Sequence, residues 1–207
     1  MKKNYLNFEN PPIEKLNKLL KYYQSKKYFN AEKLALSMIK EFPQSQFAWK
    51  VLGVIYKEVG RTKDSLFASQ KSVGLGPDDA EAHNNLGVTL QEVGKFNEAE
   101  ACYRKAIDLN PKYIQALYNL GNVLKELNKL ENAVRYYKKV ITLKPNYSEA
   151  HNNLGFTYHT LRNLNDAEAC YRKAILLKPD NAEAHNNLGI TLQEVGKFNE
   201  AEACYRK

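Results

Sequence analysis

The sequence predicts an all-α fold of stacked helix pairs, and three observations support it. Five of the seven prolines recur at one constant interval, and a fixed period of this size is typical of repeat arrays. Within each period, apolar residues follow two stripes with helical spacing. Neither helix could bury its apolar stripe alone, so neighbouring repeats must stack into a continuous core. The recurring prolines are Pro43, Pro77, Pro111, Pro145 and Pro179.

When this proline is position 32, the chain divides into six repeats after a polar leader of residues 1–11. The repeats span residues 12–45, 46–79, 80–113, 114–147 and 148–181, with a partial repeat at 182–207. Residues 80–105 and 182–207 differ only at Val88 and Ile190. We interpret this as duplication rather than engineering, because the repeats between them are irregular. The partial repeat has no proline and no following helix, so we expect Lys207 to end a fragment of a longer protein.

The first helix of each repeat carries its apolar stripe at positions 4, 7, 8 and 11. In the second repeat these are Trp49, Leu52, Gly53 and Tyr56, which follow the i, i+3, i+4, i+7 spacing of an amphipathic helix. The first repeat departs from the pattern with Leu19 at position 8. We expect this departure in a terminal repeat that turns one face to water.

The second helix carries its stripe at positions 20, 24, 27 and 28, and the proline ends it because proline cannot continue the helical hydrogen bonds. Ala99, Tyr103, Ala106 and Ile107 show this stripe. Position 15, between the helices, holds residues that tolerate the left-handed conformation in four repeats, whereas Lys26 and Arg162 break this pattern. We expect the following asparagines to cap the second helix, each with a glutamate three residues on. The position-15 residues are Gly60, Gly94, Asn128 and Gly196, and the expected caps are Asn97, Asn165 and Asn199.

These residues resemble the tetratricopeptide repeat (TPR) family, whose helix–turn–helix repeat is about 34 residues long. The segment Trp49-x2-Leu52-Gly53-x2-Tyr56 matches its first-helix motif, and alanine at position 20, tyrosine at 24 and proline at 32 match its second. The match recurs in register over almost the whole chain. The resemblance implies a solenoid that winds into a right-handed superhelix, with the first helices lining a concave groove.

No residue pattern indicates catalysis, which needs a nucleophile, a base and an orienting group in one pocket. His83, His151 and His185 share position 4 of the first helix, and we expect them to be hydrogen-bonded packing residues. Cys102, Cys170 and Cys204 share position 23, one or more repeats apart, too far for a disulfide or a metal site. A row of basic pairs on the second helices is better explained as a solvated face than as a nucleic-acid site, because acidic residues are interspersed. We therefore predict no enzyme activity, no cofactor and no metal.

The groove is expected at positions 2, 6, 9 and 13 of the first helices, which lie opposite the apolar stripe. Position 6 is asparagine in five of six repeats, and a carboxamide can both donate to and accept from the backbone of an extended peptide. The fourth repeat also has asparagine at this position, Asn119, although the rest of its first helix differs from those of the other repeats. The resemblance supports the prediction, because the TPR region of O-linked N-acetylglucosamine transferases carries a similar asparagine ladder. The predicted ladder comprises Asn17, Asn85, Asn119, Asn153 and Asn187, with Asn122 at position 9.

The predicted groove changes character along the chain. Its first part is apolar, with Phe47, Val51 and Val54, and the rest is acidic, with Glu81, Glu149 and Glu183 among the carboxylates. Acidic residues argue against the TPR carboxylate clamp, which needs basic residues. We therefore expect a partner with a neutral or basic extended segment.

Composition excludes several classes of protein. The chain is 43% hydrophobic and 26% charged, with three cysteines, which argues against disorder, a collagen repeat and a secreted disulfide scaffold. No apolar stretch is long enough to span a membrane, and the amino terminus does not resemble a signal peptide. The net charge of +8 arises mostly from residues 1–45, which hold nine lysines and four glutamates. We expect a cytoplasmic protein.

The most favoured function is a non-enzymatic protein–protein interaction module that binds an extended peptide or protein segment. Two alternatives remain open. The chain could be the substrate-docking arm of a larger glycosyltransferase, sulfotransferase or methyltransferase. It could instead be a self-associating scaffold that joins copies through its uncapped last repeat.

Overall fold

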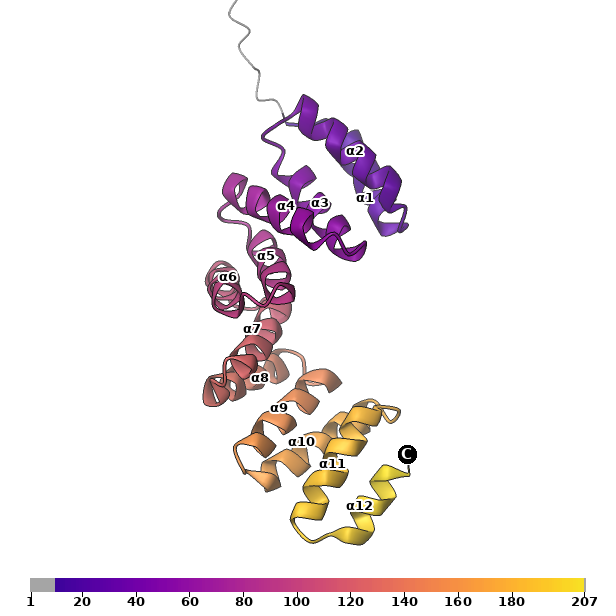
Figure 1. The fold of residues 1–207 in the computed structure, drawn as a ribbon, viewed down its shortest axis with the longest axis vertical. Helices are drawn as coiled ribbons and strands as arrows, with labels where there is room; N and C mark the ends of the chain where they lie inside the picture. The colour runs from indigo at the N-terminus through magenta and orange to yellow at the C-terminus, as the bar shows by residue number, and fades with distance from the viewer. Residues whose placement is uncertain (1–9, 207) are drawn as a thin grey trace, which may run out of the picture. The chain divides into compact units, whose positions relative to one another are not determined.

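The computed structural model describes residues 10–206, which form twelve α-helices and no strand (Figure 1). We call the odd-numbered helices A helices and the even-numbered ones B helices. The A helices are α1 (Ile13–Gln24), α3 (Gln46–Glu58), α5 (Ala80–Glu92), α7 (Ile114–Glu126), α9 (Ser148–Thr160) and α11 (Ala182–Glu194). The B helices are α2 (Tyr28–Glu41), α4 (Thr62–Leu75), α6 (Phe96–Leu109), α8 (Leu130–Leu143), α10 (Leu164–Leu177) and α12 (Phe198–Tyr205).

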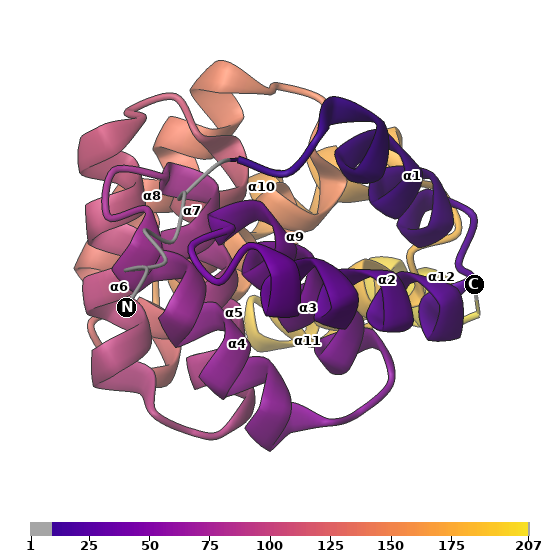
Figure 2. The ribbon, with the colours of Figure 1, turned by 90° about the horizontal axis from the view of Figure 1, so that it is seen from above.

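The helices form two compact units, which divide between Asn110 and Pro111. Within each unit every A helix packs on the B helix that follows it, and that B helix packs on the next A helix. Successive A helices also contact each other. In the first unit α1 contacts α3, and in the second unit α7 contacts α9. Figure 2 shows the same helix pairs from a second direction. The predicted all-α fold of stacked helix pairs is confirmed.

A tight turn joins the two helices of each repeat. Between α5 and α6, Lys95 N–H donates to the Leu90 carbonyl at 2.9 Å and Gly94 N–H donates to the Gln91 carbonyl at 3.0 Å. These two bonds close the helix around a left-handed residue, and Gly94 has a φ of +74°. Lys26 and Arg162, which break the sequence pattern, adopt the same conformation, with φ of 55° and 62°. The turn is therefore present in all six repeats. At Lys26 and Arg162 the left-handed conformation costs energy, because both residues have a Cβ.

The expected caps on the B helices are wrong. Helix α6 begins at Phe96, because the Ala99 N–H already donates to the Lys95 carbonyl at 3.0 Å. Its predicted cap Asn97 therefore lies inside the first turn, and Asn165 and Asn199 lie likewise in α10 and α12. Side-chain caps occur on A helices instead. Ser45 caps α3, Asp79 caps α5 and Asn181 caps α11.

Glycine at position 8 and tyrosine at position 24 fit each other in size across the two helices of one repeat. A Cβ added to Gly121 would lie 2.7 Å from the ring of Tyr137, and Gly87 and Tyr103 are related in the same way. Both rings are 0% exposed. Only a residue without a side chain leaves room for the ring at this close approach.

The first repeat solves the same packing problem differently, which corrects the expectation for Leu19. This side chain does not face water but is 0% exposed. It belongs to one buried cluster with Ala35, which occupies position 24 in this repeat. A large residue at position 8 and a small one at position 24 thus replace the glycine and tyrosine.

Candidate functional site

The candidate site is the surface of the A helices in the second unit, where α7 and α9 carry a hydrogen-bonded network. The Asn153 carboxamide nitrogen donates to the Tyr118 hydroxyl and to the Asn122 Oδ1, each at 2.9 Å. The Tyr137 hydroxyl donates to the same Asn122 oxygen at 2.7 Å. Two ladder asparagines are thereby held in fixed orientations. The oxygen of Asn153 accepts no hydrogen bond from the described residues.

Two tyrosine rings pack together beside this network. The ring centroids of Tyr118 and Tyr147 lie 5.0 Å apart with an interplanar angle of 33°. Burial raises the pKa of Tyr118 to about 12, and the negative charges of Glu149 and Glu183 add to this rise although the Asn122 hydrogen bond opposes it. Burial and Glu149 also raise the pKa of Tyr147. Both hydroxyls are therefore protonated at neutral pH. Glu149 affects the pKa of both tyrosines, whereas Glu183 affects that of Tyr118.

The surface around these rings is acidic. Glu149 and Glu183 are exposed and have no ion-pair partner among residues 10–206. Lys144 places its ammonium 4.6 Å from the centroid of the Tyr147 ring. The site therefore combines carboxylates, carboxamides and aromatic rings, a set that suits a polar or cationic ligand.

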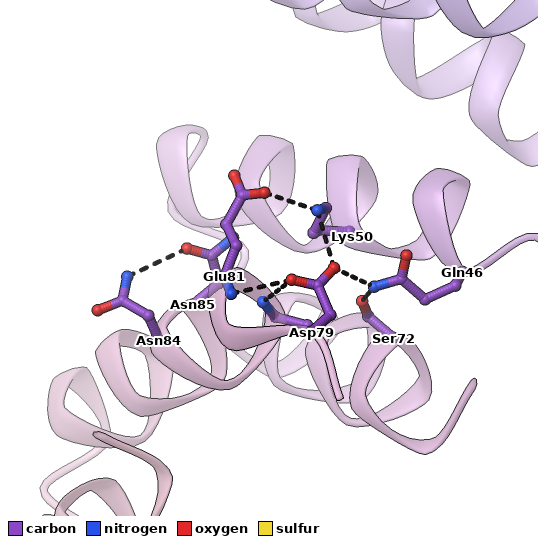
Figure 3. Close-up of polar contacts among 8 residues, drawn as sticks. Gln46, Lys50, Ser72, Asp79, Glu81, Asn84 and Asn85 are labelled. Carbon is purple, nitrogen blue, oxygen red and sulfur yellow. Dashed lines mark hydrogen bonds and ion pairs between the residues drawn. The ribbon is translucent and has the colours of Figure 1, made fainter. Parts of the chain in front are cut away.

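The corresponding surface of the first unit is already occupied by one of the chain's own lysines (Figure 3). Lys50 on α3 donates to the Asp79 Oδ2 at 2.9 Å and to the Glu81 Oε2 at 2.6 Å. The Gln46 side chain also donates to Asp79, at 2.8 Å, and to Ser72 at 3.1 Å. Burial would lower the pKa of Lys50, but the hydrogen bonds to the two carboxylates outweigh it and raise the pKa. Burial would raise the pKa of Asp79, and the bonds from Lys50 and Gln46 lower it instead.

The structure places the other predicted groove residues in different environments. Asn17 is exposed, whereas Asn85, Asn119, Asn187, Phe47 and Val54 are half-buried. Asn85 accepts a weak bond from Asn84 at 3.4 Å, and Asn187 donates to Asn152 at 3.5 Å. Among the predicted ladder residues, Asn153 and Asn122 contact each other directly.

The prediction that Val51 lines the groove is wrong. This residue is only 7% exposed and belongs to the buried cluster of the first unit, so it lines no accessible surface. Its apolar side chain packs in the core, whereas the asparagines at the same position of later repeats are half-buried. The prediction for Glu81 is also corrected in part, because Glu81 forms an ion pair with Lys50, which Asp79 shares.

Sequence reasoning missed three residues of these surfaces, which are Lys50, Tyr118 and Tyr147. Lys50 and Tyr118 share position 5, one place before the predicted ladder, and Tyr147 occupies position 34. A signal was present, because position 5 is asparagine in three other repeats and Tyr118 departs from it. Treating position 5 as part of the surface would have found both residues.

The predicted packing role of the histidines is confirmed. His83, His151 and His185 each donate from Nε2 to the carbonyl of the preceding position-32 proline, at 2.8, 3.0 and 2.9 Å. Burial lowers the pKa of His151. These side chains fasten α5, α9 and α11 to the end of the repeat that precedes each of them.

The cysteines and the carboxylates form no metal site in the described part of the chain. Cys102, Cys170 and Cys204 are free thiols. Burial raises the pKa of Cys102 and Cys170 to about 11, with small additions from Glu98 and Asp166 respectively. These thiols are poor nucleophiles at neutral pH, as packing residues are expected to be.

The last repeat exposes apolar surface. A pocket of about 400 Å³ lies between α10, α11 and α12, and Ile175, Leu176, Leu188 and Leu192 are among its lining residues. Leu176 is 72% exposed. No helix of residues 10–206 is long and apolar enough to cross a membrane.

Family models for the tetratricopeptide repeat match several segments of the chain. One matches residues 80–113 and 148–181, a second matches 102–135 and 170–203, and a TPR repeat model matches 121–161. Together they cover residues 80–203, more than half of the chain. Comparison with curated proteins gave no match.

Solved structures share the fold at low sequence identity. PilF of Pseudomonas aeruginosa has a TM-score of 0.81 at 23% identity, covering 93% of this chain and 87% of that one. YrrB, a TPR protein with an unusual peptide-binding site, has a TM-score of 0.71 at 20% identity, covering 82% and 88%. MamA from Desulfovibrio magneticus RS-1 has a TM-score of 0.73 at 20% identity, covering 78% and 91%. With its constant period, its stacked helix pairs and these matches, the chain belongs to the tetratricopeptide repeat family.

Proposed function

We propose that the chain is a non-enzymatic interaction module that docks an extended segment of another protein on the A helices of its second unit. The observation that carries the proposal is the network around Asn153. It fixes the carboxamide in place through Tyr118 and Asn122 and leaves the Asn153 oxygen free to accept a backbone N–H. A carboxamide that is already oriented loses less conformational entropy on binding than a mobile one.

The neighbouring groups favour a neutral or basic segment. Glu149 and Glu183 add negative charge to the surface, and an acidic segment would be repelled by both. The fold likeness to YrrB is consistent with a peptide ligand, although it carries no information about which side chains are recognised.

The proposal can be tested by selecting short peptides from a random display library against the whole chain and measuring their affinity by calorimetry. The double variant Asn153→Ala/Asn187→Ala removes two carboxamides from α9 and α11. Each lost hydrogen bond costs about 0.5–1.5 kcal/mol, so we expect affinity to fall by roughly tenfold. Asn165→Ala, an exposed asparagine on helix α10, is the matched control and should not change it.

Circular dichroism must show that the double variant keeps its helical content, because Asn153 also bonds within the chain. Equal affinity of the folded double variant and the wild type would contradict the proposal. A library that yields no binding peptide would contradict it as well.

Two further possibilities from the sequence remain proposals. Self-association is favoured by the apolar pocket between α10, α11 and α12, and light scattering that shows a monomer at all concentrations would exclude it. A role as the docking arm of a larger enzyme is tested by extending the reading frame beyond Lys207.

A further inference from the structure

The two units treat the same surface position in opposite ways, and this contrast points to a specific ligand group. In the first unit Lys50, Asp79 and Glu81 form an ion-paired cluster (Figure 3). Two repeats further along the chain, the same three repeat positions hold Tyr118, Tyr147 and Glu149. The second unit therefore keeps the glutamate and replaces the lysine and the aspartate with tyrosines.

The ion pair in the first unit shows what this glutamate position binds. Glu81 accepts the Lys50 ammonium at 2.6 Å, and the lysine side chain is only 15% exposed. In the second unit the chain supplies no such cation, since no described basic residue pairs with Glu149. The carboxylate thus lacks the partner that its counterpart has.

The two tyrosines stand at the repeat positions of Lys50 and Asp79, so their rings border the place that the lysine ammonium takes in the first unit. Their ring centroids lie 5.0 Å apart, and Glu149 follows Tyr147 by two residues, at the repeat position that Glu81 holds in the first unit. The charge of Glu149 also contributes to the raised pKa of both tyrosines. An ammonium or guanidinium held on a carboxylate beside an aromatic ring gains from the ring's quadrupole as well. Lys144 already shows this attraction, because its ammonium lies over the Tyr147 ring at 4.6 Å.

We propose that Tyr118, Tyr147 and Glu149 form a subsite for one lysine or arginine side chain of the docked segment. The subsite rests on the docking function proposed above and names the group that it recognises. The partner's cation takes the place that Lys50 has on Glu81. The charged groups around it are Glu149 and Glu183, which attract it, and Lys144, which contacts the Tyr147 ring and competes for that ring.

The subsite can be tested without knowledge of the partner. The probe is Nα-acetyl-lysine methylamide, followed by NMR shifts of the amides in α7 and the first turn of α9. The control probe is Nα-acetyl-norleucine methylamide, which has an apolar side chain of similar length. We expect the lysine probe to bind at least tenfold more tightly than the norleucine probe, and its affinity to fall as salt is raised.

Three variants and one control locate the binding group. Glu149 is exposed, and Glu149→Gln should weaken the affinity for the lysine probe at least fivefold. Glu131 is exposed on helix α8, and Glu131→Gln should leave that affinity unchanged. Tyr118→Lys should abolish binding, because its own ammonium would reach Glu149 as Lys50 reaches Glu81. Lys144→Met removes the competitor and should bind the probe at least as tightly as the wild type.

Equal shifts from the lysine and norleucine probes, or unchanged affinity in Glu149→Gln, would overturn the subsite. This failure differs from a failure of docking. Selected peptides that bind through the asparagines but contain no enriched lysine or arginine would support docking and refute the subsite. A lysine probe that binds when no library peptide does would support the subsite and refute docking.

Discussion

Replacing Gly121 by alanine should destabilise the second unit, although alanine is the better helix former. The added Cβ would lie 2.7, 2.9 and 3.0 Å from three ring atoms of Tyr137, where ordinary carbon contacts need about 3.5–4.0 Å. The ring is 0% exposed and its hydroxyl is bonded to Asn122, so it cannot move away without displacing neighbours.

The size of the effect follows from three contributions. Overpacking of a buried site costs about 1–3 kcal/mol. A stretched hydrogen bond to Asn122 costs about 1 kcal/mol more. The higher helix propensity of alanine returns about 1 kcal/mol. We expect the free energy of unfolding to fall by about 2 kcal/mol, which lowers the urea midpoint by roughly 1 M at a slope of about 2 kcal/mol/M.

Gly53→Ala is the matched control, because it occupies the same position of the second repeat. Its added Cβ would meet the Ser69 hydroxyl oxygen at 2.7 Å, but the backbone of Ser69 lies at 3.4 Å or more. The hydroxyl can rotate to another staggered position, so the propensity gain should leave this variant close to wild type or slightly more stable. Urea denaturation compares the two variants, and hydrogen exchange should show lost protection in α7 and α8 for Gly121→Ala. If Gly121→Ala proves as stable as Gly53→Ala, the size relation between glycine and tyrosine does not govern this core.

Three further changes test other parts of the structure. Arg162→Gly should raise the free energy of unfolding by about 0.5 kcal/mol in thermal denaturation, because relief of the left-handed conformation exceeds the loss of the exposed ion pair with Glu194 at 2.7 Å. A destabilised variant would contradict this. Lys50→Met should weaken acid sensitivity. Asp79 has a lowered pKa in the folded chain, so its stabilisation is present above the unfolded value near 3.9 and is lost as pH falls through the folded value. The variant should therefore lose less stability than wild type between pH 5 and 3 in urea denaturation, and an unchanged pH profile would refute the pairing. Tyr137→Phe should cost about 1 kcal/mol in the same assay, because the Asn122 oxygen loses one of two donors, and no change would show that the network adds nothing to stability.

The period of the prolines and the two apolar stripes were enough to predict the helix pairs, because the core of a repeat array depends on contacts that recur once in every repeat. The packing role of His83 followed from the same logic, since position 4 faces the core. What the period could not predict were departures from it. Leu19 looked like a surface substitution until Ala35 was seen beside it in the core.

The site was harder to predict than the fold for a related physical reason. Position 6 was identified by helix geometry alone, which cannot tell that Val51 turns into the core or that Asn153 is bonded to Tyr118. The caps failed because a helix that follows a left-handed turn starts earlier than its asparagine suggests. The bond between Asn153 and Tyr118 joins helices of different repeats, and a pattern within one repeat does not contain such a contact.

The pairing of Gly121 with Tyr137 lies entirely within one repeat, and this has a consequence for how such a chain can change in length. A copied segment of one repeat length takes both partners with it, so the new repeat arrives with its interior already filled. The histidine bond to the preceding proline carbonyl joins two repeats instead, and each copy in register supplies one half of it to either neighbour. Gain or loss of whole repeats that carry these residues therefore keeps both contacts, whereas an insertion of another length between two partners would separate that pair.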